Sequence, residues 1–311
     1  MTVELKVENL TKRFGNLTAV DDISFTVTGG HIYGFIGPNG AGKTTTMRII
    51  STLDLPDEGD VWIDGSSVLE QPRLARERLG FMPDAYGAYP NTTVHDYLDF
   101  YARAYGLRGR ERIDRIAYLS DFTGLKPLEK KEMGSLSKGM KQRLCLAKTL
   151  LHDPGVLVLD EPAAGLDPRA RIELRELVRA LADMGKAVLI SSHILAELSE
   201  MCHGVAVIEK GTIRASGQVA DIARGLTAHV VVYVKTLAGP EATERALLEL
   251  PGTSEVRPEH GGVEFQFHGG NDELAALLAE LVQRGLQPIE FAPRENDLED
   301  VFLTLTDGEV Q

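Results

Sequence analysis

The chain has 311 residues, a length that allows a large hydrophobic core and two domains. Its 33 Lys and Arg residues against 46 Asp and Glu residues give a net charge of −13, which argues against a basic surface for nucleic-acid phosphates, so we expect no nucleic-acid partner. The two cysteines, Cys145 and Cys202, occur in helical or apolar sequence, which predicts buried, reduced thiols and no disulfide.

The sequence predicts neither a membrane span nor a targeting segment. No stretch approaches about 18 uninterrupted apolar residues, the length that a helix needs to cross a bilayer. The first residues, MTVELK, lack the charged and apolar regions of a signal peptide. We therefore expect a cytosolic chain that does not cross a membrane by itself.

Strand and helix signals alternate over the first two thirds of the chain. Residues 1–30 alternate in polarity and contain turn residues, which predicts short, half-buried strands. From about residue 93 to residue 151, apolar residues recur at helical spacing. Buried strands that alternate with helices predict a parallel α/β sheet, with the helical block inserted as a subdomain. Further strand signals fall at residues 31–36, 61–65, 155–159 and 187–190, and in a hairpin at 204–208 and 211–214.

The composition changes after about residue 225, where an accessory domain is predicted. The order strand, helix, strand, strand, helix, strand is that of the split βαβ, or ferredoxin-like, arrangement. Residues 297–305 predict a short closing helix. The His, Pro and Gly residues of this part show no catalytic spacing. The six predicted elements cover residues 229–235, 241–250, 254–258, 263–268, 272–284 and 288–292.

The most informative motif is the segment 37–45, GPNGAGKTT, which fits the pattern G-x-x-x-x-G-K-[ST]. It lies between the strand at 31–36 and a helix predicted at 45–53. Its glycines let backbone N–H groups point inward at phosphate oxygens, and the helix adds the positive end of its dipole. The motif therefore predicts a nucleoside triphosphate site rather than an ordinary glycine-rich turn. The loop residues are Gly37, Pro38, Asn39, Gly40, Ala41, Gly42, Lys43, Thr44 and Thr45.

Individual residues of this loop have distinct expected roles. Lys43 is placed to reach the β- and γ-phosphates, and the Thr44 hydroxyl to ligate Mg²⁺. A second motif follows the apolar strand at 155–159, where Asp160 and Glu161 stand at the end of a parallel sheet. We expect Asp160 to hold Mg²⁺, usually through water, and Glu161 to orient and deprotonate the attacking water. The alternative is a strand that stops at a polar turn.

With these motifs, residues 1 to about 220 resemble the ATP-binding subunit of an ABC transporter. The segment 136–140, LSKGM, resembles the signature motif of that family. Ser137 is suited to cap a helix whose N–H groups and dipole face outward, which offers a site for the γ-phosphate of a second nucleotide. In the family this nucleotide belongs to the opposite subunit. The resemblance therefore implies that Ser137 and Gly139 contact ATP across a dimer of two copies.

The resemblance implies roles for three further positions. Residues 165–168, GLDP, are similar to the D-loop, which crosses the dimer interface in the family. His193 matches the switch histidine that contacts the γ-phosphate, with a structural histidine as the alternative. Phe14 stands where the family places an aromatic ring against adenine, with a phenylalanine of the core as the alternative.

The chain departs from the family pattern at three positions. Asp84 replaces the usual Gln of the Q-loop, and its shorter, anionic side chain is able to meet Mg²⁺ but repels an unshielded γ-phosphate. We hypothesise that Asp84 ties hydrolysis more strictly to bound metal than Gln would. In the signature, Lys138 replaces a frequent Gly and Met140 a frequent Gln.

Two other segments resemble segments of the family: one that contacts the membrane subunit, and one that is typical of a branch of the family. The text at 86–105 resembles the groove that receives a helix of the membrane subunit, although its rings are equally suited to a subdomain core. Residues 297–306 resemble the ending of subunits from the drug- and antibiotic-export branch, with Leu298, Val301, Phe302 and Leu305 on one helical face. The aromatic residues of the first segment are Tyr86, Tyr89, Tyr97, Phe100, Tyr101 and Tyr105.

These observations together predict an α/β fold of the P-loop NTPase class. Residues 1–222 form an ATP-binding domain with a RecA-like parallel sheet, a helical subdomain at about 88–153 and an N-terminal antiparallel β subdomain. Residues 226–311 form a small α+β ferredoxin-like domain. The expected function is that of an ATP-hydrolysing subunit of an ABC exporter, with ATP and Mg²⁺ as cofactors.

The expected partners are a second copy of the chain and separate transmembrane permease subunits, so that it works on the cytoplasmic face of the cell membrane. Two alternatives remain open at this point. The first is an importer ATPase with a regulatory C-terminal domain, which tends to be a small β-barrel. The second is a soluble ABC ATPase that acts on ribosomes or DNA.

Overall fold

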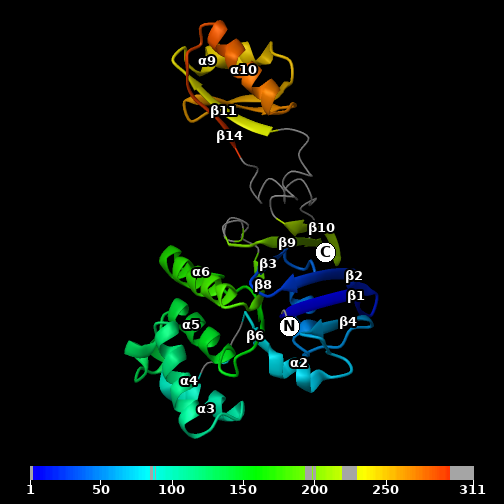
Figure 1. Ribbon diagram of the computed structural model, residues 1–311, viewed down its shortest axis with the longest axis vertical. Helices are drawn as coiled ribbons and strands as arrows, with labels where there is room; N and C mark the ends of the chain where they lie inside the picture. The colour runs from blue at the N-terminus through cyan, green and yellow to red at the C-terminus, as the bar shows by residue number, and fades with distance from the viewer. Residues whose placement is uncertain are drawn as a thin grey trace. The chain divides into compact units, whose positions relative to one another are not determined.

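The computed structural model describes residues 3–84, 87, 89–192, 198, 201–218 and 230–294. The chain divides into two compact units, with the boundary between Val219 and Ala220. Within the described residues, the first unit contains two β-sheets and a block of helices, and the second contains one sheet with two helices (Figure 1).

A six-stranded sheet forms the centre of the first unit, in the order β10-β9-β3-β8-β7-β6. Strands β9, β3, β8, β7 and β6 are parallel, and β10 pairs antiparallel with β9. The predicted parallel sheet and its hairpin are therefore confirmed. The strands are β3 (Ile32–Ile36), β6 (Leu79–Met82), β7 (Val156–Leu159), β8 (Ala187–Ser192), β9 (Gly204–Glu209) and β10 (Thr212–Gln218).

A second, antiparallel sheet lies beside the first, in the order β2-β1-β4-β5 (Figure 1). One buried cluster joins the two sheets, since Leu5 and Val61 belong to it together with Phe35 of β3 and Val158 of β7. The predicted N-terminal antiparallel β subdomain is therefore confirmed. Its strands are β1 (Glu4–Phe14), β2 (Leu17–Thr28), β4 (Glu58–Ile63) and β5 (Ser66–Ser67).

The prediction of short strands in residues 1–30 is wrong, because β1 and β2 have 11 and 12 residues. The pairing between them shifts register after Val7, which interrupts the alternation that marks a long strand. Asn9 and Asp22 adopt positive φ angles of 48° and 47° at this irregularity. The Asn9 amide donates to Asp22 Oδ1 at 2.9 Å. Because these irregularities interrupt the alternation, the sequence of two long strands looks like that of several short ones.

Helices follow the strands of the central sheet, as the sequence predicts. Helix α1 (Lys43–Ile50) comes directly after β3, and α6 (Pro168–Asp183) follows β7. Helix α2 (Pro72–Arg78) precedes β6. The predicted helical block is inserted between β6 and β7, with Val94, Leu98 and Leu119 buried in it. It consists of α3 (Val94–Ala104), α4 (Gly109–Phe122), α5 (Lys138–Thr149) and two short 3₁₀ turns, η1 (Lys126–Leu128) and η2 (Met133–Ser135).

The second unit contains a four-stranded antiparallel sheet in the order β12-β13-β11-β14. Val232, Phe265 and Leu281 belong to its buried core. The order strand, helix, strand, strand, helix, strand confirms the predicted split βαβ arrangement. The helix predicted at 297–305 lies outside the described residues. The elements are β11 (Val230–Thr236), α9 (Pro240–Leu248), β12 (Thr253–Glu259), β13 (Gly262–Phe267), α10 (Asn271–Gln283) and β14 (Pro288–Arg294).

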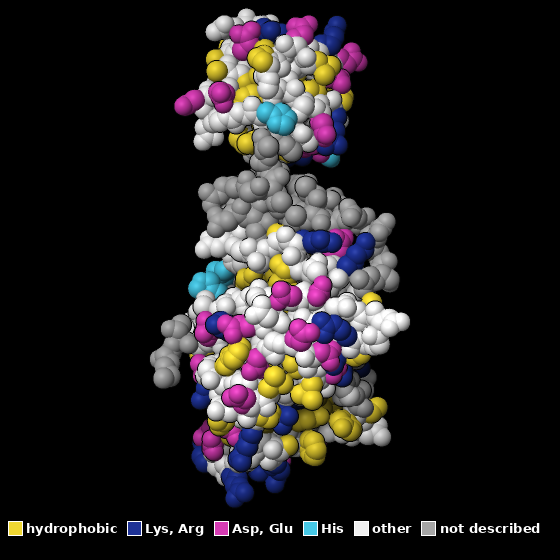
Figure 2. Space-filling model, turned by 90° about the vertical axis from the view of Figure 1, so that its right-hand side faces the viewer, with side chains coloured by type: hydrophobic (Ala, Val, Ile, Leu, Met, Phe, Trp, Pro, Cys, Tyr) yellow, Lys and Arg dark blue, Asp and Glu magenta, His cyan; other side chains and the backbone are white. Residues whose placement is uncertain are grey.

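The surface and the two thiols agree with the composition. Lys and Arg side chains are interspersed with Asp and Glu side chains on the face in Figure 2. Both cysteines are free; Cys145 is buried and Cys202 is partly buried. In the part of the chain that the structure describes, no helix is both long and apolar enough to span a bilayer.

Candidate functional site

The glycine-rich loop closes a pocket at the C-terminal end of β3. The pocket has a volume of about 260 Å³. Gly42 has a φ angle of 106°, and a Cβ atom at this position would fall against the carbonyl oxygen of Ala19, so only glycine fits. Gly42 also precedes α1 as its N-cap without a side-chain cap hydrogen bond, which leaves the start of the helix open to an anion. The lining residues are Phe14, Leu17, Ala19, Asn39, Gly40, Gly42, Lys43, Thr44 and Thr45.

The ammonium group of Lys43 lies inside this loop. The side chain is 6% exposed, and its Nζ donates to the carbonyl oxygens of Gly37 and Pro38 at 2.7 and 3.2 Å. Glu161 Oε1 lies 3.8 Å from the same nitrogen. Burial lowers the pKa of Lys43, and the negative charges of Glu161 and Asp160 oppose that shift. The Lys43 ammonium therefore lies where the motif predicts the phosphates.

Asp160 follows β7 and is 3% exposed. Its backbone N–H donates to the Met82 carbonyl at 2.8 Å, which fixes it against the end of β6. Burial raises the pKa of Asp160, hydrogen bonds from Ser191 and Thr44 lower it, and the negative charges of nearby carboxylates raise it further. The structure therefore brings Thr44 and Asp160 together, as the sequence predicts.

Asp84 lies just beyond the end of β6 and is exposed. Its negative charge contributes to the raised pKa of Asp160. A hydroxyl and two carboxylates are the oxygen donors that Mg²⁺ prefers, and open space at Asp84 leaves room for the waters that this ion keeps. The donor chemistry of Thr44, Asp84 and Asp160 therefore suits Mg²⁺, and their role as its ligands stays a prediction.

Glu161 is held in an unusual backbone conformation. Its φ angle of 48° lies in the left-handed region, which few residues other than glycine adopt. Its N–H donates to the Ser191 hydroxyl at 2.9 Å, and its side chain is 15% exposed. The conformation directs the carboxylate of Glu161 towards Lys43 instead of continuing the strand.

Ser191 is a site residue that the sequence analysis did not identify. It is completely buried near the end of β8, and its hydroxyl donates to Asp160 Oδ1 at 2.7 Å. The strand order is what identifies Ser191 as a site residue, since β8 lies between β3 and β7 in the sheet. A polar side chain near the C-terminal end of β8 must lie between the glycine-rich loop and the two carboxylates.

Phe14 lies at the rim of the pocket and is 49% exposed. The Lys12 ammonium lies 5.3 Å from the centre of its ring. The alternative of a core phenylalanine is therefore wrong. Stacking against adenine stays a prediction for Phe14.

The signature segment begins a helix, as predicted. Ser137 is the N-cap of α5 and accepts a hydrogen bond from the Met140 N–H at 3.3 Å. A Cβ atom on Gly139 would lie 2.8 Å from Ala170 Cβ, so the first turns of α5 and α6 are in close contact. Among the residues that the structure describes, the lining of the glycine-rich pocket includes neither Ser137 nor Gly139.

The structure describes the D-loop residues but not the switch histidine. Asp167 caps α6 by accepting a hydrogen bond from the Ala170 N–H at 3.0 Å. Gly165 has a φ angle of 65°, and the Lys138 ammonium occupies the space where a side chain at this position would stand. The expected catalytic residue His193 lies outside the described residues.

The aromatic segment of the helical subdomain is mostly exposed. Tyr97 is buried at 2% exposure, whereas Tyr89, Phe100 and Tyr105 are 52%, 60% and 44% exposed. Neighbouring ring centres lie 6.3 Å apart for Tyr89 and Tyr97, 4.9 Å for Tyr97 and Tyr101, and 5.2 Å for Phe100 and Tyr101. The core alternative therefore holds for Tyr97. Tyr86 lies outside the described residues.

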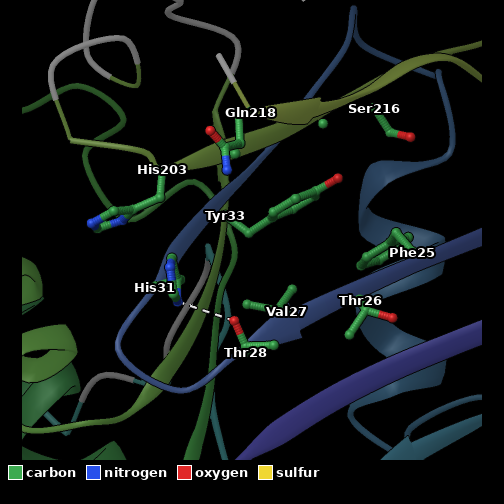
Figure 3. A pocket seen from close by; sticks show the side chains of 11 residues that line it. Phe25, Thr26, Val27, Thr28, His31, Tyr33, His203, Ser216 and Gln218 are labelled. Atoms are coloured by element: carbon green, nitrogen blue, oxygen red, sulfur yellow. Dashed lines mark hydrogen bonds between the residues drawn. The ribbon is translucent and has the colours of Figure 1, made fainter. Parts of the chain in front are cut away.

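A larger pocket of about 500 Å³ lies at the opposite end of β3 from the glycine-rich loop (Figure 3). His31 and Tyr33 of this pocket stand at the start of the strand, and His203 Nδ1 accepts a hydrogen bond from the Ile32 N–H at 3.1 Å. Burial raises the pKa of Tyr33 to about 12. The sequence predicted no role for these residues, and the pocket is separate from the predicted phosphate site.

Comparisons with known proteins identify the family. Residues 20–164 match the family described as ABC transporter. The Nod factor export ATP-binding protein I of Burkholderia lata is 36% identical over 97% of this chain and 97% of that protein. The linearmycin resistance ATP-binding protein LnrL of Bacillus subtilis is 31% identical over 97% of this chain and 98% of that protein.

Solved structures give the same answer for the fold. The structure of an ATP-binding subunit of an ABC transporter matches with a TM-score of 0.65 and 31% sequence identity. The match covers 71% of this chain and 92% of the solved chain. A nucleotide-free ATP-binding cassette from an ABC transporter has a TM-score of 0.63 and 25% identity, with 70% and 92% coverage. The chain belongs to the family of ABC transporter ATP-binding subunits, which hydrolyse ATP, and it is homologous to subunits of the export and drug-resistance branch.

Proposed function

We propose that this chain is the ATPase of an ABC exporter, acting as a pair of copies with separate permease subunits on the cytoplasmic face of the cell membrane. The proposal rests on one observation above all: Glu161 is held 3.8 Å from the Lys43 ammonium beside an open glycine-rich loop. The two relatives named for export or drug resistance support the direction of transport, because each covers nearly the whole chain.

The chemistry of the proposed site needs positioning and charge neutralisation more than covalent help. The loop N–H groups and Lys43 hold the β- and γ-phosphates of ATP. Glu161 orients the attacking water and accepts its proton. Thr44, Asp84 and Asp160 would hold Mg²⁺, which neutralises charge on the phosphates when it is bound.

Members of this family generally dimerise and pair with membrane permeases, and we propose the same assembly for this chain. Ser137 and Gly139 would contact the nucleotide held by the second copy, because the N-terminus of α5 carries N–H groups that suit an anion. Phe14 would stack on adenine. His193 would contact the γ-phosphate, as its match to the switch histidine implies.

The aromatic residues of the helical subdomain supply a docking surface for the permease in this proposal. Tyr89 and Phe100 expose about half or more of their surface, and their rings form a continuous set of contacts through Tyr97 and Tyr101. Exposed aromatic side chains that are fixed by their neighbours are well suited to protein interfaces.

The C-terminal unit argues against the importer alternative. We propose residues 1–222 as the ATP-binding domain and residues 226–311 as an accessory domain. The described elements of the accessory domain have the ferredoxin-like order, whereas importer tails tend to be small β-barrels. The soluble alternative, an ATPase acting on ribosomes or DNA, receives no support from a chain with a net charge of −13.

Replacement of the proposed base separates ATP binding from hydrolysis. We expect Glu161→Gln to lower ATP turnover by at least about 100-fold, because the amide cannot accept the proton from water. ATP should still bind and should hold two copies together. Phosphate release and size-exclusion chromatography in the presence of ATP measure the two effects.

The control for this experiment is Glu176→Gln, which makes the same chemical change on the surface of α6, where the Glu176 side chain is 60% exposed. It should leave turnover unchanged. Normal turnover in the Glu161→Gln variant would place the base elsewhere.

The departure at Asp84 gives a prediction about metal dependence. We expect Asp84→Gln to keep a larger share of its maximal turnover at low Mg²⁺ concentration, because the neutral amide does not repel a poorly shielded γ-phosphate. A titration of ATPase activity against free Mg²⁺ measures this, with Asp121→Gln as the surface control, because the Asp121 side chain is 71% exposed. Identical Mg²⁺ curves for the wild type and the Asp84 variant would remove the hypothesis.

Loss of an exposed aromatic ring should weaken attachment to the permease. We expect Phe100→Ala to lower the amount of the chain recovered in the membrane fraction of its own cells about tenfold, as for the loss of an interface hot spot. The ATPase activity of the isolated chain should stay unchanged. Ile172→Ala removes an apolar side chain of similar exposure, 52%, from α6 and serves as control. Equal membrane recovery of wild type and Phe100→Ala would contradict a docking role.

A further inference from the structure

Ser191 makes two hydrogen bonds that join neighbouring strands at the edge of the central sheet. Its hydroxyl donates to Asp160 Oδ1 at 2.7 Å and accepts from the Glu161 N–H at 2.9 Å. A serine hydroxyl has one proton to donate, so the donor role goes to the carboxylate and an oxygen lone pair goes to the N–H. The residue is completely buried. Water therefore does not substitute for either contact.

The two partners of Ser191 are consecutive residues with different tasks. Asp160 continues the line of β7, and its N–H is bonded to the end of β6. Glu161 then turns into the left-handed region at a φ angle of 48°. The turn between the two carboxylates needs a partner for the Glu161 N–H, because a buried donor without an acceptor is unfavourable.

The position of β8 explains why the partner comes from this strand. Leu189 of β8 pairs with Tyr33 of β3 on one side and with Val158 of β7 on the other. The C-terminal end of β8 is thus placed between β3, which leads into the loop before Lys43, and β7, which the two carboxylates follow. A short side chain with both a donor and an acceptor fits this place, whereas an apolar one would leave two polar groups unpaired.

We infer that Ser191 is a positioning residue for ATP hydrolysis, which fixes the carboxylate of Glu161 towards the γ-phosphate and the carboxylate of Asp160 towards Thr44. The inference rests on the proposed function of this site. It assigns Ser191 no contact with ATP, so its effect is exerted through Glu161 and Asp160. A movement at the end of β8 would consequently change the aim of the proposed base.

The chain offers a matched control for the loss of a buried hydroxyl. Ser120 in α4 is also completely buried, and its Oγ has no hydrogen-bond partner among the residues that the structure describes. Ser120→Ala therefore makes the same chemical change at the same burial without removing a hydrogen bond. Ser191→Cys nearly preserves the volume of Ser191 but replaces the hydroxyl by a weak donor and acceptor, which separates hydrogen bonding from packing.

We expect Ser191→Ala and Ser191→Cys to lower kcat for ATP about 10- to 100-fold, the usual effect of losing a group that orients a functional side chain. The KM for ATP should stay within about twofold, since the phosphate loop is untouched. Ser120→Ala should change neither. In the Glu161→Gln background, Ser191→Ala should lower the residual single-turnover rate by much less than it does alone, because residues that act as a unit are not additive.

A second measurement does not depend on catalysis. Hydrogen exchange of the segment 156–165 should become faster in Ser191→Ala without nucleotide, because the Glu161 N–H loses its acceptor, and should be unchanged in Ser120→Ala. Unchanged exchange with unchanged kcat would overturn the inference, as would a raised KM with normal kcat. An inactive wild type, with or without permease-containing membranes, would instead contradict the proposed ATPase function, and the exchange result would still decide whether Ser191 holds the segment.

Discussion

The burial of opposite charges at one edge of the six-stranded sheet constrains the rest of the first unit. Lys43 and Asp160 are 6% and 3% exposed, and both would be unfavourable there without partners. The loop carbonyls, the Ser191 hydroxyl and Glu161 supply those partners. Because these partners come from β8 and from the segments that follow β3 and β7, the order β3-β8-β7 is a condition for burying the charges at all.

The same arrangement prepares the site for phosphate. Burial lowers the pKa of Lys43, and the negative charges of Glu161 and Asp160 oppose this shift. Burial raises the pKa of Asp160, and hydrogen bonds from Ser191 and Thr44 oppose that shift. The ammonium already contacts carbonyl oxygens of the loop, so in the proposed function a bound phosphate would replace one set of oxygen partners by another. The start of α1 and the left-handed turn at Glu161 suit this exchange, because they place the N-terminus of a helix and a carboxylate beside the Lys43 ammonium.

Features that depend on local sequence could be predicted, and features that depend on strand order could not. A few consecutive residues determine each of three features: the glycine-rich loop, the carboxylates after β7 and the Ser137 cap. The motif therefore predicts the local geometry. The elements of the accessory unit could also be predicted from local sequence. Its first helix, predicted at 241–250, is Pro240–Leu248. Ser191 was missed because its neighbours in space are 30 and 31 residues away in sequence. The lengths of β1 and β2 were missed because bulges hide their alternation.

The two thiols have a practical consequence for work on this chain. Burial raises the pKa of both Cys145 and Cys202. Since the thiolate is the reactive form of cysteine, neither should be readily alkylated or oxidised at neutral pH. A fluorophore or spin label could therefore be attached through a cysteine introduced on an exposed helix, and distances between such labels would report conformational changes without prior removal of the native thiols.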